Sequence, residues 1–520
     1  MSLYNRLMIL HITLIEIEAE EMKYTSTRGT ATVGETYALL NGLAADGGLY
    51  VPAVFPERCL TYDMLADKSY QELAYIVLSK FFPNFSEAEL MDMINAAYSK
   101  ANFDTPDIAP LHSLLERVSV LELFHGRTQA FKDMALSLFP YLLVAAKKAE
   151  GETKDVLILT ATSGDTGKAA LEGFKDVPGT HIQVFFPTDG VSPMQQEQMQ
   201  KQEGANVNVT AINGNFDDAQ QFLKRLFVNE EVGAKAAEKG VKFSSANSIN
   251  IGRLTPQIVY YVAAYANLVA TGAIHENEAF NVVVPTGNFG NILAAYFAKR
   301  MGVPIGKLIC ASNRNNVLTD FFKTGTYDMN RPFYTTLSPS MDILESSNFE
   351  RFIYYISGEN AELTAKRMAD LKTTGRMSVT PDELALVQRD FSGAFVNDDE
   401  TEAIIEQVYN SYGYLMDPHT AVAMGAYMKE LQAHPQDGAR HTVIAATAHP
   451  FKFPPAICKA LDIVEGGTPY ESLEHISAVT GVAFPGPLAA LQQKPLRFTK
   501  VIDKENMRHE IFDFIDSFGK

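Results

Sequence analysis

Cysteine is scarce in this sequence, and neither cysteine nor histidine shows a spacing typical of a metal site. Among 520 residues there are only three cysteines, Cys59, Cys310 and Cys458, and no two of them form a CxxC pair. The 11 histidines include no HExxH motif and no paired spacing. We therefore expect neither a bound metal nor a disulfide framework. The cysteine content is typical of a reducing compartment such as the cytoplasm.

Basic residues and long apolar runs are also in short supply. Lysine and arginine number 44 against 62 aspartate and glutamate residues, which gives a formal net charge of −18. Such an acidic chain is a poor partner for nucleic acid or for an anionic membrane surface. No apolar run reaches the length that spans a bilayer. We expect a small-molecule partner, and an anionic one would need a local pocket of amides and cations.

The first 21 residues, MSLYNRLMILHITLIEIEAEE, lack the features of a secretory signal. Arg6 is their only basic residue, and the apolar stretch ends in glutamates rather than in a small-residue cleavage site. We interpret residues 1–21 as an N-terminal extension ahead of a start at Met22.

Two nucleotide-binding motifs are also missing. In TATSGDTGKAA, Thr162 and Ala169 occupy positions where a Walker A loop needs glycine and then serine or threonine. What remains is a small polar turn at a helix N-terminus, where free N–H groups and the hydroxyls of Ser163 and Thr166 favour an anion. The alternative is a capping turn without a ligand, in which Ser163 or Asp165 is the N-cap.

The stretch VVVPTGNFGNILAA does not contain the dinucleotide motif GxGxxG. It has instead two glycines, Gly287 and Gly290, which frame Asn288 and Phe289, and Asn291 begins a helix. Glycines let the backbone approach a ligand closely, and the helix N-terminus favours a phosphate. One phosphate therefore fits better than two. A strand-to-helix turn without a ligand is the alternative.

Along the chain, continuous apolar strands such as DVLILTA, IQVFFP and FNVVVP alternate with helical patterns. This order predicts an α/β fold with parallel sheets flanked by helices, and ligands in such sheets bind at the carboxyl ends of the strands. We expect a mainly helical N-terminal domain over residues 22–122 and an α/β catalytic region over 123–470. The latter has a helical insertion at about 319–417, and a C-terminal segment covers 471–520.

A lysine in an unusual setting, together with these turns, indicates one shared binding site. Lys132 lies between Phe131 and Asp133, at the start of an apolar helical pattern. A lysine near apolar surface has a depressed pKa, as a Schiff-base lysine requires, although a snorkelling lysine would show the same pattern. Thr447 ends another buried strand and is followed by His449, and both have ordinary structural interpretations. Together, a lysine, a monophosphate cradle and a hydroxyl are what pyridoxal phosphate needs.

The motifs as a set resemble the threonine synthase family. KYTSTRG and DGGLYVP resemble its N-terminal domain, and FHGRTQAFKDMA, SGDTG, SANSINIGR, GNFGN and TAHPFKF resemble its cofactor domain in the same order. The resemblance runs from Met22 to at least Pro454, with departures at Arg127 and Phe451, where proline and alanine are more usual. It implies a fold type II pyridoxal phosphate enzyme that converts O-phospho-L-homoserine and water to L-threonine and phosphate.

The resemblance also implies roles for individual residues. Lys132 would bind the cofactor covalently and exchange protons with the substrate, and Thr447 would face the pyridine nitrogen. The cofactor phosphate would be held by Gly287, Asn288, Phe289 and Asn291. The substrate set would be Ser163, Asp165, Thr166, Asn247 and Arg253.

Two other functions stay open at this point. A related lyase would release phosphate and ammonia, and a non-catalytic relative would bind a ligand on the same fold. The resemblance is compatible with a cytoplasmic monomer or homodimer.

Overall fold

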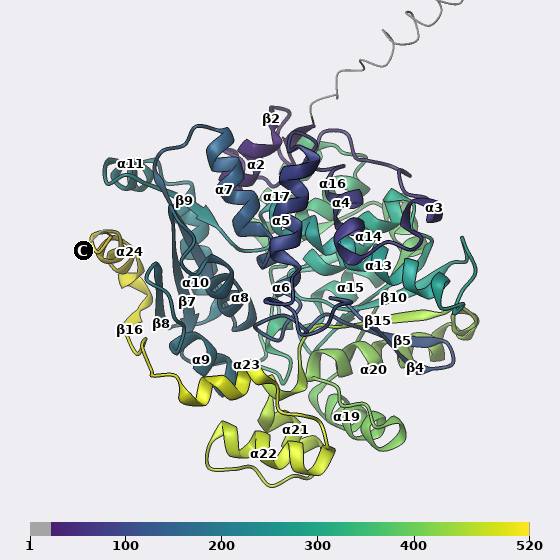
Figure 1. Cartoon of the computed structure of the whole chain (residues 1–520). Coiled ribbons are helices and arrows are strands. Elements are labelled where there is room, and N and C mark those ends of the chain that lie inside the picture. The colour runs from purple at the N-terminus through teal and green to yellow at the C-terminus, as the bar shows by residue number, and fades with distance from the viewer. Residues whose placement is uncertain (1–21, 519–520) are drawn as a thin grey trace, which may run out of the picture.

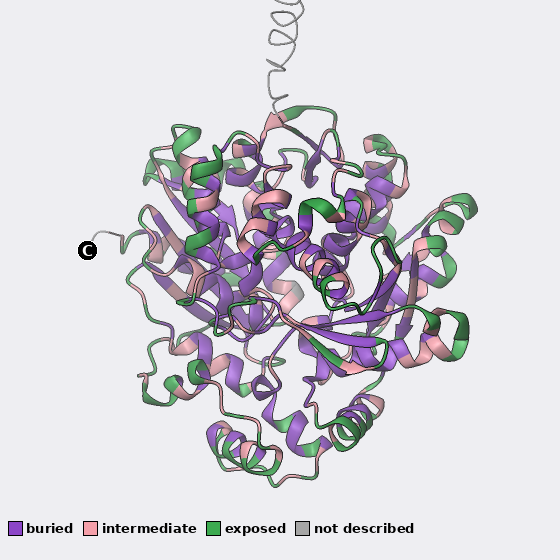
Figure 2. Cartoon of the chain, turned by 45° about the vertical axis from the view of Figure 1, so that its right-hand side comes forward, coloured by how far each residue is buried: buried purple, intermediate pink, exposed green. Residues whose placement is uncertain are grey.

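The computed structural model describes residues 22–518, so the extension expected over residues 1–21 lies outside the described part of the chain. Two parallel sheets lie side by side in the described part, with helices packed around both (Figure 1). Most of their strands are buried, apart from the edge strands Leu111–Leu115 and Val501–Asp503, and most exposed residues lie on outer helices and loops (Figure 2). This is the α/β architecture that apolar strands alternating with helices predict.

The larger sheet has six strands in the order β14-β11-β10-β15-β5-β4. All neighbours are parallel except β4, which pairs antiparallel with β5. Its strands are β4 (Leu111–Leu115), β5 (Val118–Glu122), β10 (Phe280–Pro285), β11 (Ile305–Ser312), β14 (Phe391–Phe395) and β15 (Thr442–Ala446). The central strands β10 and β15 are buried at every position, which requires the uninterrupted apolar runs seen in their sequences.

The second sheet has five strands in the order β16-β8-β7-β6-β9, and every pair is parallel. Its strands are β6 (Asp155–Ala161), β7 (Thr180–Pro187), β8 (Val207–Asn213), β9 (Val241–Ser245) and β16 (Val501–Asp503). The carboxyl end of β6 leads directly into the SGDTG turn. The edge strand β16 comes from the far C-terminus and covers β8.

Helices cover both sheets. Those next to the five-stranded sheet are α7 (Phe139–Ala149), α8 (Asp165–Phe174), α9 (Pro193–Gln200), α10 (Phe216–Phe227) and α11 (Glu230–Glu238). Those next to the six-stranded sheet include α13 (Pro256–Ala270), α14 (Gly290–Met301), α15 (Val317–Thr324) and α20 (Pro418–Ala433). Short helices α6 (Asp133–Leu136) and α12 (Ile251–Leu254) lie between the two groups and carry residues of the site.

The N-terminal residues form a small antiparallel sheet and a group of helices at the top of Figure 1. The elements are β1 (Lys23–Ser26), β2 (Thr32–Gly34), β3 (Tyr50–Pro52), α2 (Glu35–Asn41), α3 (Tyr62–Leu65), α4 (Tyr70–Leu78) and α5 (Glu87–Ala97). Ser69 and Ser86 begin α4 and α5 with complete capping boxes. Helix α4 packs on α13, so this group covers one side of the catalytic region.

The predicted insertion at 319–417 is mostly helical but is not separate from the sheet. It contains β12 (Thr326–Asp328), α16 (Phe349–Ile356), α17 (Ala361–Thr374), β13 (Arg376–Ser378), α18 (Pro381–Asp390) and α19 (Asp398–Tyr412). Strand β14 also lies in this range and pairs with β11 as the edge strand of the larger sheet. Its sequence, FSGAF, is too short and too mixed in polarity to stand out as a buried strand.

The C-terminal residues run along the bottom and left of Figure 1 in yellow. They form α21 (Pro454–Ala460), α22 (Pro469–Thr480), α23 (Gly486–Ala489), β16 and α24 (Met507–Ile515). Across residues 22–518 no helix combines the length and apolarity that crossing a membrane requires. Cys59, Cys310 and Cys458 are all free thiols.

Candidate active site

Lys132 is held where the two sheets meet, immediately before helix α6. The backbone N–H of Phe131 donates to the carbonyl oxygen of Thr447 at 2.8 Å, which ties the lysine segment to the end of β15. The Lys132 ammonium nitrogen lies 4.0 Å from the centroid of the Phe131 ring. The aromatic residue before the lysine therefore provides the apolar surface against which the amine packs.

Burial lowers the pKa of the Lys132 amine to about 7. The nearby guanidinium of Arg253 lowers it further, the carboxylate of Asp165 opposes the shift, and the ammonium of Lys452 adds to it. A lysine with this pKa is partly uncharged at neutral pH and is therefore a competent nucleophile and base. This setting favours the reactive interpretation of Lys132 over a snorkelling one.

The GNFG turn joins β10 to α14 and has an uncommon backbone at Phe289. Phe289 has φ 62° and ψ 0°, a left-handed conformation that bulky residues rarely adopt. Its ring is buried in an aromatic cluster with Phe322, Phe349, Phe352 and Phe391. This packing holds the turn in place, and the first N–H groups of α14, which have no partner inside the helix, begin directly after it.

Asn291 presents a free donor in the first turn of α14. Its Oδ1 accepts hydrogen bonds from the hydroxyls of Tyr260 and Tyr261, which fixes the orientation of the amide. Its Nδ2 is buried without a hydrogen-bond partner. Asn288 is fixed differently, because its carbonyl oxygen accepts from the backbone and side-chain nitrogens of Asn348 at 3.1 and 3.0 Å. The turn is thus rigid, and one buried N–H group of it awaits an acceptor.

The two glycines of the turn have different neighbours. A Cβ atom on Gly287 would lie 2.3 Å from the carbonyl oxygen of Ser340, whereas one on Gly290 would meet nothing closer than 3.4 Å. Gly287 is therefore required by the close approach of the Ser340 backbone rather than by a ligand. At Gly290 the protein itself leaves room.

One cavity brings most of the predicted site residues together. Besides Gly290, it is lined by the predicted residues Lys132, Arg253, Gly287, Asn288, Phe289, Asn291 and Thr447, and by Phe131, Ser248, Gln257, Pro285, Thr286, Ser340, Met341 and His419. They come from the ends of β10 and β15, from the loop before α6, from helices α12, α13, α14 and α20, and from the 3-10 turn Pro339–Met341. The convergence at the carboxyl ends of parallel strands is the arrangement that the strand pattern predicts.

Arg253 supplies a permanent positive charge at this cavity. Its side chain is buried, one guanidinium nitrogen donates to the Ala246 carbonyl oxygen, and Nε has no hydrogen-bond partner. Burial lowers the pKa of Arg253 to about 10, with Tyr260 opposing, so the group stays charged at neutral pH. A buried cation with an unused donor suits an anionic ligand.

The other four predicted substrate residues do not line this cavity. Ser163 and Thr166 are half-buried in the SGDTG turn and the first turn of α8. Asn247 follows β9, and its Nδ2 donates to the Ala161 carbonyl oxygen at 3.0 Å, joining two strand ends. Their direct contact with substrate stays a prediction.

The SGDTG turn is capped by Thr162 rather than by Ser163 or Asp165. The Thr162 hydroxyl oxygen accepts from the N–H groups of Gly164 at 2.9 Å and Gly167 at 2.8 Å. The structure assigns the N-cap position to Gly164, which makes no side-chain cap. The prediction that Ser163 or Asp165 is the N-cap is therefore wrong, because two glycines allow the backbone to fold over a threonine that precedes them.

Asp165 is occupied by a buried ion pair. The Lys452 ammonium lies 2.6 Å from its Oδ1, and Gln195 Nε2 donates to the same oxygen at 2.7 Å. Burial alone would raise the pKa of Asp165, but Lys452 lowers it overall. Lys452 also donates to the Thr128 carbonyl oxygen at 2.8 Å. Asp165 therefore positions the turn instead of facing an anion with a bare charge.

Sequence reasoning did not single out Lys452 or His419. His419 is buried, its Nδ1 lies 2.7 Å from Asp417 Oδ2, and its Nε2 accepts from the Ser340 N–H at 3.2 Å. In this pattern Nδ1 faces the Asp417 carboxylate and Nε2 acts as the acceptor. Lys452 is part of the TAHPFKF motif, so a signal existed for it. For His419 the only signal is an ordinary helix start, DPHT.

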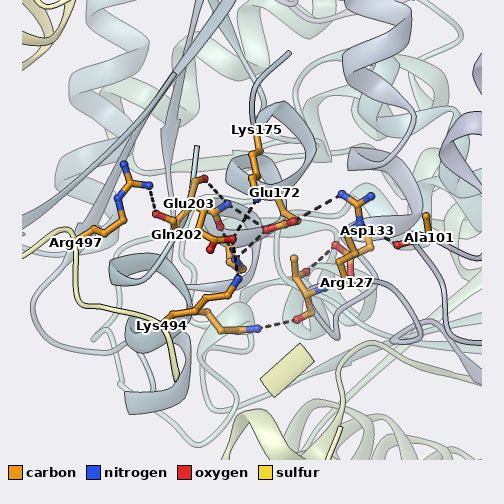
Figure 3. Close-up of polar contacts among 12 residues, drawn as sticks. Ala101, Arg127, Asp133, Glu172, Lys175, Gln202, Glu203, Lys494 and Arg497 are labelled. Carbon is orange, nitrogen blue, oxygen red and sulfur yellow. Dashed lines mark hydrogen bonds and ion pairs between the residues drawn. The ribbon is translucent and has the colours of Figure 1, made fainter. Parts of the chain in front are cut away.

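The segment that leads to Lys132 is anchored by a charged network at α8 (Figure 3). Arg127 lies 3.7 Å from Glu172, and Lys168 lies 3.2 Å from the same carboxylate. Burial opposes ionisation of Glu172, but Lys168 and Gln202 lower its pKa to about 2. Arg497 in turn donates to the Gln202 carbonyl oxygen at 2.7 Å. The C-terminal chain thus braces the helix that follows the SGDTG turn.

Comparison with known proteins decides the family. The family model described as Threonine synthase N terminus matches residues 23–98, that of Pyridoxal-phosphate dependent enzyme matches 112–447, and that of Threonine synthase, C-terminal matches 420–511. The chain belongs to the threonine synthase family. Membership explains why a lysine, a glycine turn and a threonine from three distant segments share one cavity.

Individual relatives agree with this assignment. Threonine synthase from Schizosaccharomyces pombe is 37% identical over 473 residues, covering 85% of this chain and 90% of that protein. Human Threonine synthase-like 1 is 41% identical over 439 residues, covering 82% of this chain, which spans 58% of the human protein. The crystal structure of PLP-bound threonine synthase from Brucella melitensis has a TM-score of 0.82 and 37% identity, covering 95% of this chain and all of that one.

The residues of the cavity fit the cofactor of this family. The free N–H groups at the start of α14 and the unpaired Nδ2 of Asn291 would suit a phosphate. The desolvated amine of Lys132 would suit an aldehyde. Thr447, which lines the same cavity, would offer a hydroxyl to a ring nitrogen. Each reactive part of pyridoxal phosphate therefore has a chemically matched partner among the residues present.

Proposed function

We propose that this chain converts O-phospho-L-homoserine and water to L-threonine and phosphate with pyridoxal phosphate as cofactor. The observation that carries the proposal is the cavity in which the desolvated Lys132, the GNFG turn and Thr447 meet. Family membership supports the same activity. Pyridoxal phosphate, when bound, withdraws electrons from an attached amino acid and so makes its C–H bonds acidic.

Lys132 moves protons in this reaction. With a pKa of about 7, its amine accepts a proton from the α carbon of the substrate and returns it late in the cycle without a large cost in either direction. A proton is lost from the β carbon as phosphate leaves the γ carbon, and the γ carbon then takes up a proton. Water adds its oxygen at the β carbon and gives up a proton. Because Lys132 packs on Phe131, its amine would be held close to the reacting atoms while it moves protons.

Arg253 and the ion pair of Lys452 with Asp165 organise the charge around the leaving phosphate. Arg253 keeps an unpaired Nε–H at the cavity and is the donor best placed for the substrate phosphate. Lys452 is already paired with Asp165, so it contributes to the electrostatic field rather than acting as a free hydrogen-bond donor. Ser163, Thr166 and Asn247 complete the proposed substrate set from the neighbouring strand ends.

A product assay tests the proposal. Purified protein loaded with pyridoxal phosphate is incubated with O-phospho-L-homoserine, and threonine, phosphate, ammonia and keto acid are measured. We expect threonine and phosphate in equal amounts, and loss of turnover by orders of magnitude in Lys132→Ala. Ammonia and keto acid in place of threonine would establish the related lyase, and absence of all products would support a non-catalytic binding protein. We further propose a cytoplasmic monomer or homodimer, which size-exclusion chromatography with light scattering tests for assembly.

A further inference from the structure

The end of helix α20 brings together three side chains that bind metal ions. Glu430 and His434 are four residues apart, and Asp437 follows in the 3-10 turn Pro435–Ala439. One ligand atom from each lies within 4.8 Å of the others. Backbone hydrogen bonds from His434 to Glu430 and from Asp437 to His434 fix this spacing. None of the three lines the active-site cavity.

Glu430 shows that the cluster lacks a partner. Its side chain is only 5% exposed, and its Oε1 is buried without a hydrogen-bond partner. The nearest basic atom is Nδ1 of His434 at 3.4 Å, and that histidine side chain is 51% exposed. Leaving a buried carboxylate oxygen without a donor or cation is costly. The oxygen that lacks a hydrogen-bond partner is the one that lies nearest His434.

The cluster opens onto a surface groove that gives an ion and its waters access. The groove has a volume of about 790 Å³ and is lined by residues of β14, α20 and the turn after it. Arg440 lies 3.2 Å from Asp437 Oδ1 and is the competing cation. Lys429, also in the groove, is engaged by Glu400 at 2.7 Å. A bound ion would have to displace the exposed Arg440 from Asp437 and replace the His434–Glu430 contact.

We propose that Glu430, His434 and Asp437 bind a divalent transition-metal ion of the zinc class. Two carboxylates and one imidazole suit such an ion, and three protein ligands leave positions for water. Ligand distances of about 2.0–2.2 Å require the three atoms to draw together slightly. The exposed ring of His434 is free to make that movement. The three ligands do not show HExxH spacing, because they span the end of a helix and the turn after it.

The ion would join α20 to the turn that leads into β15, the strand that ends at Thr447. Binding only to the folded state stabilises it by mass action, so the unfolding temperature rises with ion concentration. Because none of the ligands lines the active-site cavity, we expect turnover to be unchanged.

The test is a titration of the full-length, cofactor-loaded protein with Co²⁺, followed by its visible absorbance, and with Zn²⁺, followed by the unfolding temperature. We expect one equivalent to bind and the unfolding temperature to rise. Changes at residues that only support a metal ligand weaken metal binding by roughly tenfold or more. Loss of a direct ligand should weaken it further, so the His434→Ala and Asp437→Asn variants should each bind the metal more than about tenfold more weakly. The matched control is His509→Ala, which removes a histidine from an exposed i,i+4 pair with Asp513 at 3.4 Å.

Two results would overturn the proposal. One is the absence of stoichiometric binding by the unaltered protein. The other is equal weakening by His434→Ala and His509→Ala, which would mean diffuse surface binding. If the unaltered protein binds no ion and His434→Ala alone lowers its unfolding temperature, the His434–Glu430 contact stabilises the fold without a metal.

Discussion

The amine of Lys132 owes its reactivity to what surrounds it. The aromatic residue before it suggests an apolar contact from sequence alone, and the structure supplies the ring at 4.0 Å. The two cations that lower its pKa further, Arg253 and Lys452, lie 121 and 320 positions away along the chain (253 − 132 and 452 − 132). Such long-range charges leave no local pattern. The lysine could therefore be predicted, but the size of its pKa shift could not.

The pH dependence of cofactor uptake follows from this shift. With a pKa of about 7, the reactive neutral amine should rise roughly tenfold per pH unit below pH 7 and then level off. A lysine at its ordinary value of 10.5 would keep gaining reactivity up to that pH. The two cases are distinguished by stopped-flow measurement of pyridoxal phosphate binding to the cofactor-free protein. The measurement runs from pH 5.5 to 9.5, a range of about four units. A rate still climbing steeply at the alkaline end would contradict the burial argument.

Thr447 gives a second prediction at this scale. Thr447→Val keeps the shape and the backbone carbonyl that accepts from Phe131, but it removes the hydroxyl. Leaving the ring nitrogen without its partner costs about 1–3 kcal/mol, so cofactor affinity should fall roughly ten- to a hundredfold. Equilibrium dialysis measures the affinity, and thermal unfolding of the cofactor-free protein serves as control. A lower unfolding temperature with unchanged affinity would make Thr447 a purely structural residue.

At the scale of elements, strands and turns were predictable wherever the chain is apolar and bounded by glycine or polar turns. Strands β6, β7, β10 and β15 are of this kind, since all are nearly fully buried. Strand β14 is short and mixed in polarity, and the sequence places it inside the expected insertion at about 319–417. Gly287 shows another limit, because the Ser340 carbonyl that excludes a side chain there lies in a segment far along the chain.

The buried ion pair between Lys452, in the 3-10 turn Pro450–Lys452, and Asp165 of helix α8 links two elements at the site. Lys452→Met should leave Asp165 buried and unpaired, at a cost of about 3–5 kcal/mol. Its carboxyl pKa, now lowered by Lys452, would rise, so the variant should lose the stability that ionised Asp165 contributes above its ordinary pKa of 3.8. Thermal unfolding at pH 7 measures the loss.

The matched control for this ion pair is Lys366→Met, which removes an exposed lysine paired with the exposed Asp370 at 2.7 Å. An exposed pair contributes less than about 1 kcal/mol, so its unfolding temperature should hardly change. Adding Asp165→Asn to Lys452→Met should restore part of the loss, because no charge is then left buried. Equal destabilisation by the two lysine variants would show that the buried pair contributes no more to stability than the exposed pair.

At the scale of the whole molecule, an acidic protein surrounds a cavity that carries local positive charge. The formal charge of −18 predicts that an anionic substrate needs such charge, and Arg253 and the partly protonated Lys132 provide it at the cavity from two separate segments. The C-terminal chain contributes to the same centre indirectly, since Arg497 contacts Gln202 beside α8 (Figure 3). Its place on the second sheet had no sequence signal, because β16 is three residues long.

Removal of residues 497–520 should therefore damage the fold rather than trim it. Strand β16 covers the edge of β8, and Met507, Ile511 and Ile515 of α24 are buried against the same sheet. Burial of such side chains contributes about 1.5–3 kcal/mol each, and an uncovered strand edge promotes aggregation. We expect a lower unfolding temperature and aggregated material by light scattering. Removal of residues 1–21 is the control and should change neither, because the family match begins at residue 23. A truncated protein that stays monodisperse with an unchanged unfolding temperature would show that the C-terminal chain is dispensable for the fold.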